Sequence, residues 1–185
     1  MKITICGIPE LASHSEAGVT HVLSIIDPGW PDPEAFGDFP PHHREALRFH
    51  DVIEPTQGAV PTAAHVTRLL AFGEDVMVAG GATHLLIHCH AGISRSTASA
   101  ALLLAQADPA RAAEDIFAEI SRLRPRAWPN LLLLELGEAA LGRTGEIAPA
   151  VAAQYRRVLA LDPAFGEFIR AAGRAREVDL AAGLL

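Results

Sequence analysis

A continuous apolar run, HLLIHC at residues 84–89, passes through a short loop into the Ala- and Leu-rich segment STASAALLLAQA. A run without polar alternation is typical of a strand buried on both faces of a parallel or mixed sheet. The segment after the loop predicts a helix. A buried strand that continues directly into a helix is typical of layered α/β domains.

The rest of the chain continues this alternation. Short apolar runs predict further strands at residues 2–6, 19–26 and 46–50. Helices are predicted around residues 9–16, 61–79, 109–123 and 131–141, and from 149 onward. The Pro-rich segment 27–43 predicts a long surface loop. Together these elements predict an α/β domain with a central four- to five-stranded, mostly parallel sheet flanked by helices, with extra C-terminal helices.

Composition excludes several classes of function. The net charge of −7 argues against general affinity for nucleic acid or for anionic membranes, because both depend on a dense basic surface. Two cysteines are too few for a disulfide framework, and residues 1–11 lack the pattern of a signal peptide, so we expect a reduced, cytoplasmic protein. No apolar run approaches the ~20 residues of a membrane-spanning helix. An anionic ligand would therefore need a local site.

The loop after the buried strand supplies such a site. Cys89 ends the strand, and the next helix is predicted to begin at Arg95. The residues between them are enough to curl the backbone into a cup whose N–H groups point inward. Gly92 allows the turn, and Arg95 can direct two N–H donors onto phosphate oxygens. We therefore expect a phosphate-binding loop formed by His90, Ala91, Gly92, Ile93, Ser94 and Arg95.

The same electrostatic field acts on Cys89. Inward peptide dipoles, the helix N-terminus and Arg95 favour the thiolate, and such settings lower a cysteine pKa from ~8.5 to as little as ~4. The sulfur is then a nucleophile at neutral pH. We expect His88 to tune the thiolate through hydrogen bonds, and Ser96 to donate its hydroxyl proton when the sulfur departs. Cys6 is either a resolving thiol for oxidised Cys89 or a buried strand cysteine.

The segment HCHAGISRS resembles the signature loop of the cysteine-dependent protein tyrosine phosphatases, in the version seen in dual-specificity phosphatases. VTHVLSI resembles the second strand of that family, LRFHDVIEP its strand leading to the general acid, and SRLRPRAWPN the run before its last core helix. The resemblance covers roughly residues 18–141. We expect a phosphatase-like catalytic domain at 1–141, and a helical extension at 142–185 packed on the same domain.

This resemblance implies phosphomonoester hydrolysis without a metal or cofactor. Cys89 would attack phosphorus to form a thiophosphoryl intermediate, while Arg95 and the loop amides hold the equatorial oxygens. An Asp would protonate the leaving oxygen and later activate the hydrolytic water. Asn130, a predicted helix N-cap, would help to fix the loop. The expected partners are phosphorylated proteins or small aryl phosphomonoesters, and phosphate, sulfate or vanadate would occupy the loop.

Two residues compete for the role of the acid. Asp32 lies in the tripeptide WPD, which spells the acid loop of the larger tyrosine phosphatases, but it precedes the strand predicted at 46–50. Asp51 directly follows that strand and leaves room for one helix and one strand before Cys89, as the topology of the family demands. We favour Asp51 and keep Asp32 as the alternative.

Other functions compatible with the loop remain open. A phosphate-binding module without turnover would use the same residues, and sulfurtransferases and thiol arsenate reductases also hold a reactive cysteine in a short loop. A metal site from His84, His88, Cys89 and His90 would require adjacent strand residues to converge, although they alternate faces. The loop lacks the extra Lys or Arg of inositol-lipid phosphatases, and the chain lacks a tyrosine-recognition loop. We therefore expect a shallow pocket for aryl phosphomonoesters, with alkyl phosphomonoesters as an open alternative.

Overall fold

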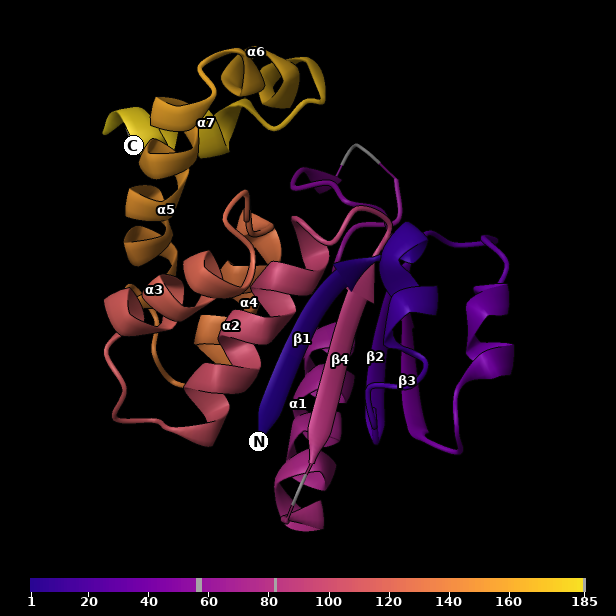
Figure 1. The fold of residues 1–185 in the computed structure, drawn as a ribbon. Helices are drawn as coiled ribbons and strands as arrows, with labels where there is room; N and C mark the ends of the chain where they lie inside the picture. Colours follow the sequence, from indigo (N-terminus) through magenta and orange to yellow (C-terminus); the bar gives the residue numbers. More distant parts are fainter. Residues whose placement is uncertain (56–57, 82, 185) are drawn as a thin grey trace.

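A parallel sheet forms the centre of the computed structural model, which describes residues 1–55, 58–81 and 83–184 (Figure 1). Its strands are β1 (Lys2–Gly7), β2 (His21–Ile26), β3 (His43–Arg48) and β4 (His84–Cys89). They are all parallel, in the order β1-β4-β2-β3. The predicted apolar strand β4 is central and buried at every position. The α/β fold with a mostly parallel sheet is thereby confirmed, and the described sheet has four strands.

Helices flank this sheet and continue beyond it. The α-helices are α1 (Ala63–Ala79), α2 (Arg95–Ala107), α3 (Ala113–Leu123), α4 (Leu131–Ala140), α5 (Ile147–Leu161), α6 (Ala164–Ala171) and α7 (Ala175–Ala182), and two 3-10 helices span Ile8–His14 and Glu34–Asp38. Helix α6 lies beyond the carboxyl end of β4, where the loop emerges (Figure 1). No helix in the described ranges is both long and apolar enough to cross a membrane.

The alternation of side chains along the strands produces a separate hydrophobic cluster on each face of the sheet. The larger cluster joins the strands to side chains of all the helices from α1 to α7. The smaller one contains Cys6, Leu11, Val19, Val22, Phe39 and Leu86. Cys89 belongs to the larger cluster, so Cys6 and Cys89 lie on opposite faces of the sheet. The arrangement favours the interpretation of Cys6 as a buried strand cysteine.

The C-terminal helices pack against the segment that precedes α4. The Trp128 ring stacks on that of Tyr155 in α5, with ring centroids 4.2 Å apart. The Tyr155 hydroxyl donates a hydrogen bond to the carbonyl of Pro129. Glu177 of α7 accepts a hydrogen bond from Nε1 of Trp128 at 2.6 Å. Because these aromatic side chains are fully buried, α5 and α7 share one core with the preceding helices.

Several predicted boundaries were wrong for local reasons. Strand β3 begins at His43 and not at 46, because the whole segment HREALR pairs with β2. The Pro-rich stretch 27–43 therefore ends at this strand, and it contains the second 3-10 helix. Helix α3 begins later than predicted because the N–H of Ala110 is held in a turn by the Asp108 carboxylate. Helix α5 begins earlier because Glu138 accepts hydrogen bonds from the N–H groups of its first turn.

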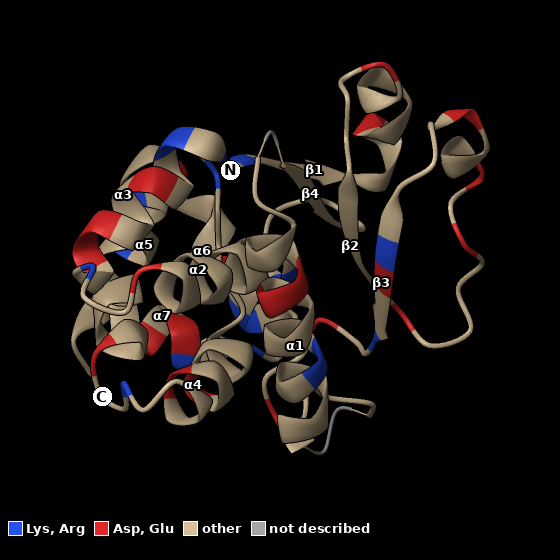
Figure 2. Cartoon of the chain, turned by 90° about the horizontal axis from the view of Figure 1, so that it is seen from below, with Lys and Arg blue, Asp and Glu red and all other residues tan. Residues whose placement is uncertain are grey.

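Charged residues of both signs are distributed over the helices and strands (Figure 2). Basic and acidic positions are interspersed along the helices. Acidic residues outnumber basic ones in the sequence, 22 to 15. An anionic ligand is therefore expected to depend on a local arrangement of donors.

Candidate active site

The loop between β4 and α2 turns its backbone carbonyls outward. These carbonyls accept hydrogen bonds from Ile8 N (to His90 O, 3.0 Å), Arg124 Nη2 (to Ala91 O, 3.1 Å), Arg124 Nε (to Gly92 O, 3.0 Å), Trp128 N (to Ile93 O, 2.9 Å) and Ala98 N (to Ser94 O, 3.0 Å). Within the described chain, none of the N–H groups of residues 90–94 donates a hydrogen bond to protein. The N–H groups are therefore available to an anion, and the predicted phosphate-binding role of the loop stays a prediction.

The loop lies directly against the end of β1, backbone on backbone. A Cβ added at Gly92 would come within 2.4 Å of the carbonyl carbon of Cys6, and the φ of Gly92 is +69°. A Cβ added at Gly7 would come within 2.9 Å of the carbonyl carbon of Ala91. Only glycine satisfies both the close approach and the left-handed backbone at position 92. The shape of the loop therefore depends on this glycine pair.

Arg124 fixes the loop from outside. Besides its bonds to the two loop carbonyls, its Nη1 donates to Oε1 of Glu10 at 2.8 Å. The other Glu10 oxygen accepts from the N–H of Gly7 at 2.6 Å. From the sequence, Arg124 could extend the positive field around the loop or belong to an exposed helix end, and its hydrogen bonds to the loop carbonyls were not predicted. Its neighbours Arg122 and Arg126 pair with Glu119 and Asp162.

Cys89 lies at the base of the loop and is almost fully buried. Its sulfur is 3.2 Å from the hydroxyl oxygen of Ser96. Helix α2 begins at Arg95, as predicted, so its N-terminus adjoins the loop. The structure therefore brings together Cys89, Ser96 and the helix N-terminus. This arrangement can stabilise a thiolate through peptide dipoles and one hydroxyl donor.

One edge of the Arg95 guanidinium is fixed by protein. Nη1 donates to Oδ1 of Asp27 and to the carbonyl of Phe49, both at 2.6 Å. Nε is buried and has no partner among the described residues. Burial raises the pKa of Asp27, but the charges of Arg95 and His90 outweigh burial and hold it below its usual range. Asp27, which directly follows β2, was not predicted as a site residue. Its position at the carboxyl end of a strand was the only signal in the sequence.

Asp51 lies against the loop. Its Oδ1 accepts hydrogen bonds from Ser94 Oγ (2.7 Å) and Asn130 Nδ2 (2.9 Å), and it forms an ion pair with Arg174 Nη1 (3.1 Å). Burial raises the pKa of Asp51, but the charges of Arg174 and Arg95, with the hydrogen bonds of Asn130 and Ser94, hold it below its usual range. Asn130 also caps α4 by accepting from Leu133 N at 3.0 Å. The predicted N-cap thus also holds the Asp51 carboxylate.

The alternative acid, Asp32, lies elsewhere. Its side chain is 56% exposed and pairs with Arg44 at 3.1 Å and with Arg48 at 2.7 Å, both on β3. The neighbouring Trp30 does approach the loop, with its ring centroid 4.7 Å from that of His90. Asp32 is not among the residues that line the cavity over Cys89, whereas Asp51 is. The preference for Asp51 remains a prediction that this placement favours.

His88 is directed away from the thiolate. It is fully buried, and its Nε2 hydrogen-bonds to the hydroxyl of Ser24 on β2 at 2.7 Å. That hydroxyl also accepts from Nε of Arg44 at 2.8 Å, so it can donate to the neutral imidazole. Burial, reinforced by Arg44, lowers the pKa of His88 to about 4. His88 is therefore neutral at pH 7. Its hydrogen bond to Ser24 links β4 to β2 and does not involve the sulfur of Cys89.

A cavity of about 370 Å³ opens over Cys89 and Arg95. One side is formed by the loop and Asp51. The opposite side comes from the C-terminal part of the chain, through Phe165, Phe168, Ile169 and Arg174. The sequence predicts only a packed helical extension at 142–185, and no motif marks these four positions. The structure assigns them to the wall of the cavity.

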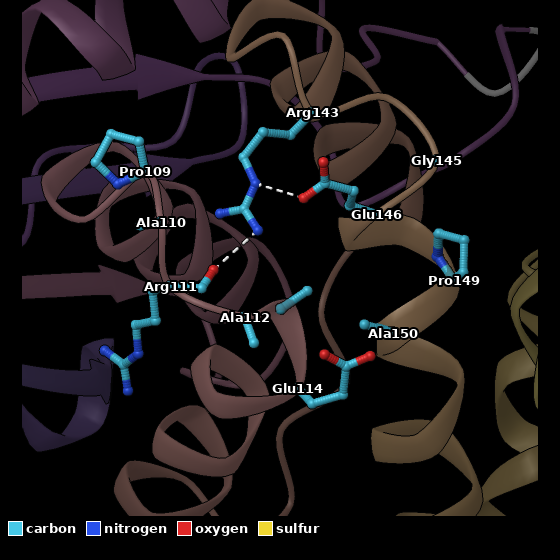
Figure 3. A pocket seen from close by; sticks show the side chains of 11 residues that line it. Pro109, Ala110, Arg111, Ala112, Glu114, Arg143, Gly145, Glu146, Pro149 and Ala150 are labelled. Atoms are coloured by element: carbon cyan, nitrogen blue, oxygen red, sulfur yellow. Dashed lines mark hydrogen bonds and ion pairs between the residues drawn. The ribbon is translucent and has the colours of Figure 1, made fainter.

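A second cavity, of about 470 Å³, lies between the loops that precede α3 and α5 (Figure 3). Nε of Arg143 donates to Glu146 at 2.8 Å, and its Nη2 donates to the carbonyl of Arg111 at 2.9 Å. The carboxylate of Glu114 also lines this cavity. No lining residue is a cysteine, serine or histidine. This second cavity therefore lacks a nucleophile comparable to the Cys89 thiol, which lines the first cavity.

The predicted metal-site alternative is not supported by the placement of its residues. His84, at the start of β4, hydrogen-bonds to Thr4 and to the carbonyl of Ala17. His88 bonds to Ser24, as described above. Over the residues that the structure describes, no three His, Cys, Asp or Glu side chains are grouped so that they could hold a metal ion.

Comparison with solved structures identifies the fold. Human DUSP28 matches with a TM-score of 0.57 and 21% sequence identity, over 77% of this chain and 95% of that chain. The chain has a dual-specificity phosphatase-like fold. DUSP15 matches this dual-specificity phosphatase-like fold with a TM-score of 0.56 and 23% identity, over 75% of this chain and 85% of that chain. PTPMT1 in complex with PI(5)P matches with a TM-score of 0.55 and 16% identity, over 76% of this chain and 90% of that chain.

Sequence comparisons add no closer relative. No model of a protein family matches the chain, and no curated protein matches it. Identities of 16–23% support a shared dual-specificity phosphatase-like fold and do not transfer an activity. The function must therefore be argued from the residues around Cys89.

Proposed function

We propose that the protein is a metal-independent phosphomonoester hydrolase, similar to protein tyrosine and dual-specificity phosphatases, that acts through a thiophosphoryl intermediate on Cys89. The loop supports this proposal most strongly. Its backbone carbonyls accept hydrogen bonds from surrounding groups, and Cys89 and Arg95 line the same cavity. Its inward N–H groups and the free Nε of Arg95 suit the oxygens of a phosphate.

The reaction requires two displacements at phosphorus. In the first, the Cys89 thiolate forms the S–P bond as the P–O bond to the leaving alcohol breaks, and Asp51 donates its proton to that oxygen. In the second, Asp51 takes a proton from water, whose oxygen attacks phosphorus as the S–P bond breaks. Ser96 stabilises the departing thiolate with its hydroxyl hydrogen. Arg95 and the loop amides hold the phosphoryl oxygens in both steps.

Protonation of Asp51 depends on the bound substrate. Without substrate, Arg174 and Arg95 favour its carboxylate form. A phosphate ester dianion would place negative charge beside Asp51 and would pair with Arg95, and both effects raise a carboxyl pKa. A monoanionic phosphate ester, with a second pKa near ~6, can also deliver the required proton on binding. Asp51 is therefore expected to act as an acid in the complex.

The cavity favours an apolar alcohol group on the phosphate. Its outer wall contains Phe165, Phe168 and Ile169. The loop positions between Cys89 and Arg95 supply no Lys or Arg for additional phosphates. We therefore expect phosphorylated proteins or small aryl phosphomonoesters to be better substrates than highly phosphorylated inositol lipids, although the matched PTPMT1 structure contains PI(5)P.

The experiment that tests this function is hydrolysis of p-nitrophenyl phosphate in the presence of EDTA. We expect turnover by the wild-type protein and by Cys6→Ser, and loss of at least ~10³-fold in Cys89→Ser. The two variants form a matched pair, because both cysteines are buried and only Cys89 lines the cavity. Retention of a phosphopeptide without release of inorganic phosphate by the wild type would instead support a binding module. Full activity in Cys89→Ser would contradict the proposal.

A further inference from the structure

Arg174 connects the C-terminal helices to the loop. It directly precedes α7, is 4% exposed and lines the cavity over Cys89. Its Nη1 lies 3.1 Å from Oδ1 of Asp51, and its Nη2 donates to the hydroxyl of Ser94 at 2.9 Å. That hydroxyl in turn donates to the same Asp51 oxygen. A residue of the predicted extension therefore contacts both the expected acid and the phosphate loop.

Glu177 holds Arg174 in this position. Nε and Nη2 of Arg174 donate to the two carboxylate oxygens of Glu177 at 2.9 and 2.7 Å. Glu177 is fully buried, and it also accepts from Trp128 Nε1 at 2.6 Å and from Leu131 N at 3.0 Å. A forked guanidinium–carboxylate pair with every oxygen bonded is a rigid arrangement. Through Glu177, Arg174 is thus tied to Trp128 and Leu131.

The two oxygens of Asp51 differ as a result. Oδ1 accepts hydrogen bonds from Ser94 and Asn130 and pairs with the Arg174 guanidinium, whereas no described residue donates to Oδ2. A proton on Oδ1 would displace one of these donors. The proton that Asp51 transfers must therefore be on Oδ2, the oxygen that remains free for a substrate.

We propose that Arg174 is a positioning residue for the carboxyl group of Asp51: by holding Oδ1, it directs Oδ2 and its proton toward the leaving oxygen of a substrate bound in the cavity. This inference rests on the proposed function. The charged or titratable groups that face Asp51 are Arg174 before α7, Arg95 on α2, His90 in the loop and Tyr155 on α5. Arg174 alone among the four contacts the carboxylate directly.

The test compares substrates that differ in their need for an acid. Phenyl phosphate has a more basic leaving group than p-nitrophenyl phosphate, so its hydrolysis depends more on proton donation. We expect Arg174→Met to lower kcat/KM about tenfold or more for phenyl phosphate and several-fold less for p-nitrophenyl phosphate. The basic limb of the pH–rate profile should move to higher pH, because a cation that favours the Asp51 carboxylate is lost.

Two further variants separate positioning from a general structural role. Arg170→Met removes an arginine of α6 that pairs with Asp179 and does not line the cavity, so we expect no change with either substrate. In an Asp51→Asn background, Arg174→Met should cause no additional selective loss with phenyl phosphate. If Arg174→Met fails to fold, Arg174→Lys retains the charge without the fork and should show the selective loss with a smaller pH shift.

Equal losses with both substrates and an unshifted pH limb would overturn the inference, as would unchanged activity in Arg174→Met. Selective loss that persists in the Asp51→Asn background would also overturn it, because Arg174 would then act on something other than Asp51. Absence of turnover in the wild type would overturn the proposed function itself. An active wild type with an unselective Arg174 variant would overturn the positioning role alone.

Discussion

Asp27 at the end of β2 accepts a hydrogen bond from Nη1 of Arg95 at 2.6 Å, although the two residues are far apart in the sequence. The pair fixes one edge of the guanidinium and leaves Nε without a partner among the described residues. Parallel strands explain this meeting, because their carboxyl ends lie at one edge of the sheet. A carboxylate there can orient an arginine that, in the proposed function, also binds the phosphate.

Removal of the Asp27 charge is expected to weaken this orientation. Hydrogen bonds to charged groups contribute about 1.5–3 kcal/mol, which corresponds to roughly 10- to 100-fold in rate. We predict that Asp27→Asn lowers kcat/KM for p-nitrophenyl phosphate by about tenfold or more. Asp32→Asn is the control, because Asp32 pairs with β3 and does not line the cavity; its activity should stay within about twofold of wild type. A larger loss in Asp32→Asn would instead indicate that Asp32 is the general acid.

Replacement of Asp51 should change the pH dependence of the reaction. If Asp51 supplies the proton, activity falls on the basic side as this proton is lost, and Asp51→Asn should remove that limb. We expect a decrease in kcat of about 10²-fold or more, as is typical for general acids. Measured pH–rate profiles of wild type, Asp51→Asn and Asp32→Asn check this assignment. Retention of the basic limb in Asp51→Asn would contradict it.

Gly92→Ala should lower the free energy of unfolding more than Gly29→Ala does, although the two glycines have similar φ angles. Gly92 has a φ of +69° and Gly29 a φ of +77°, but only a Cβ at Gly92 meets backbone atoms, at 2.4 Å from Cys6. Overpacking of this kind costs about 1–3 kcal/mol beyond the shared backbone strain. Denaturant unfolding of Gly92→Ala and Gly29→Ala measures the difference. Equal free energies of unfolding would show that the loop does not press on β1.

Arg124→Ala should lower activity through the shape of the loop. It removes the donors to the carbonyls of Ala91 and Gly92 and the ion pair with Glu10. We expect kcat/KM to fall about tenfold, because the loop amides lose part of their alignment. Arg122→Ala is the control, since its side chain is 72% exposed and pairs only with Glu119 among the described residues. Similar losses in both variants would indicate a general effect of charge.

His88 should make stability depend on pH in a defined window. Its pKa is about 4 in the folded protein, against about 6.5 in an unfolded chain, so the unfolded state binds more protons between these values. The free energy of unfolding should therefore fall as pH decreases from about 6.5 to 4, by up to ~3 kcal/mol from this residue. His88→Gln should flatten that dependence, and a slope equal to wild type would contradict it.

The sequence predicted the parts of the site that are contiguous in the chain. The strand–loop–helix unit from β4 to α2 follows from a local pattern, so Cys89, Ser96 and Arg95 occur where they were expected. Asn130 was predicted as a helix cap, and the structure adds its bond to Asp51. The predicted strand, helix start and helix cap are confirmed because spacing and periodicity determine local geometry, while the catalytic roles of these residues stay predictions.

The missed residues act across long separations. Arg124, Arg174 and Asp27 each bond to the loop or to its arginine from another element. Arg124 lies in the family-like run SRLRPRAWPN, but the sequence did not distinguish it from an arginine at an exposed helix end, which is common. No motif marks Arg174 or Asp27. Their partners follow only from the order of strands and from the packing of α7 on Trp128.

The most direct measurement of the central claim is chemical trapping of the intermediate. Asp51→Asn, or wild type at short times, should be mixed with an aryl phosphate, quenched in acid and digested for mass spectrometry. We predict a phosphoryl group on the peptide that contains Cys89, and none in Cys89→Ser. Steady release of inorganic phosphate with no phosphorylated Cys89 at any quench time would contradict a thiophosphoryl pathway.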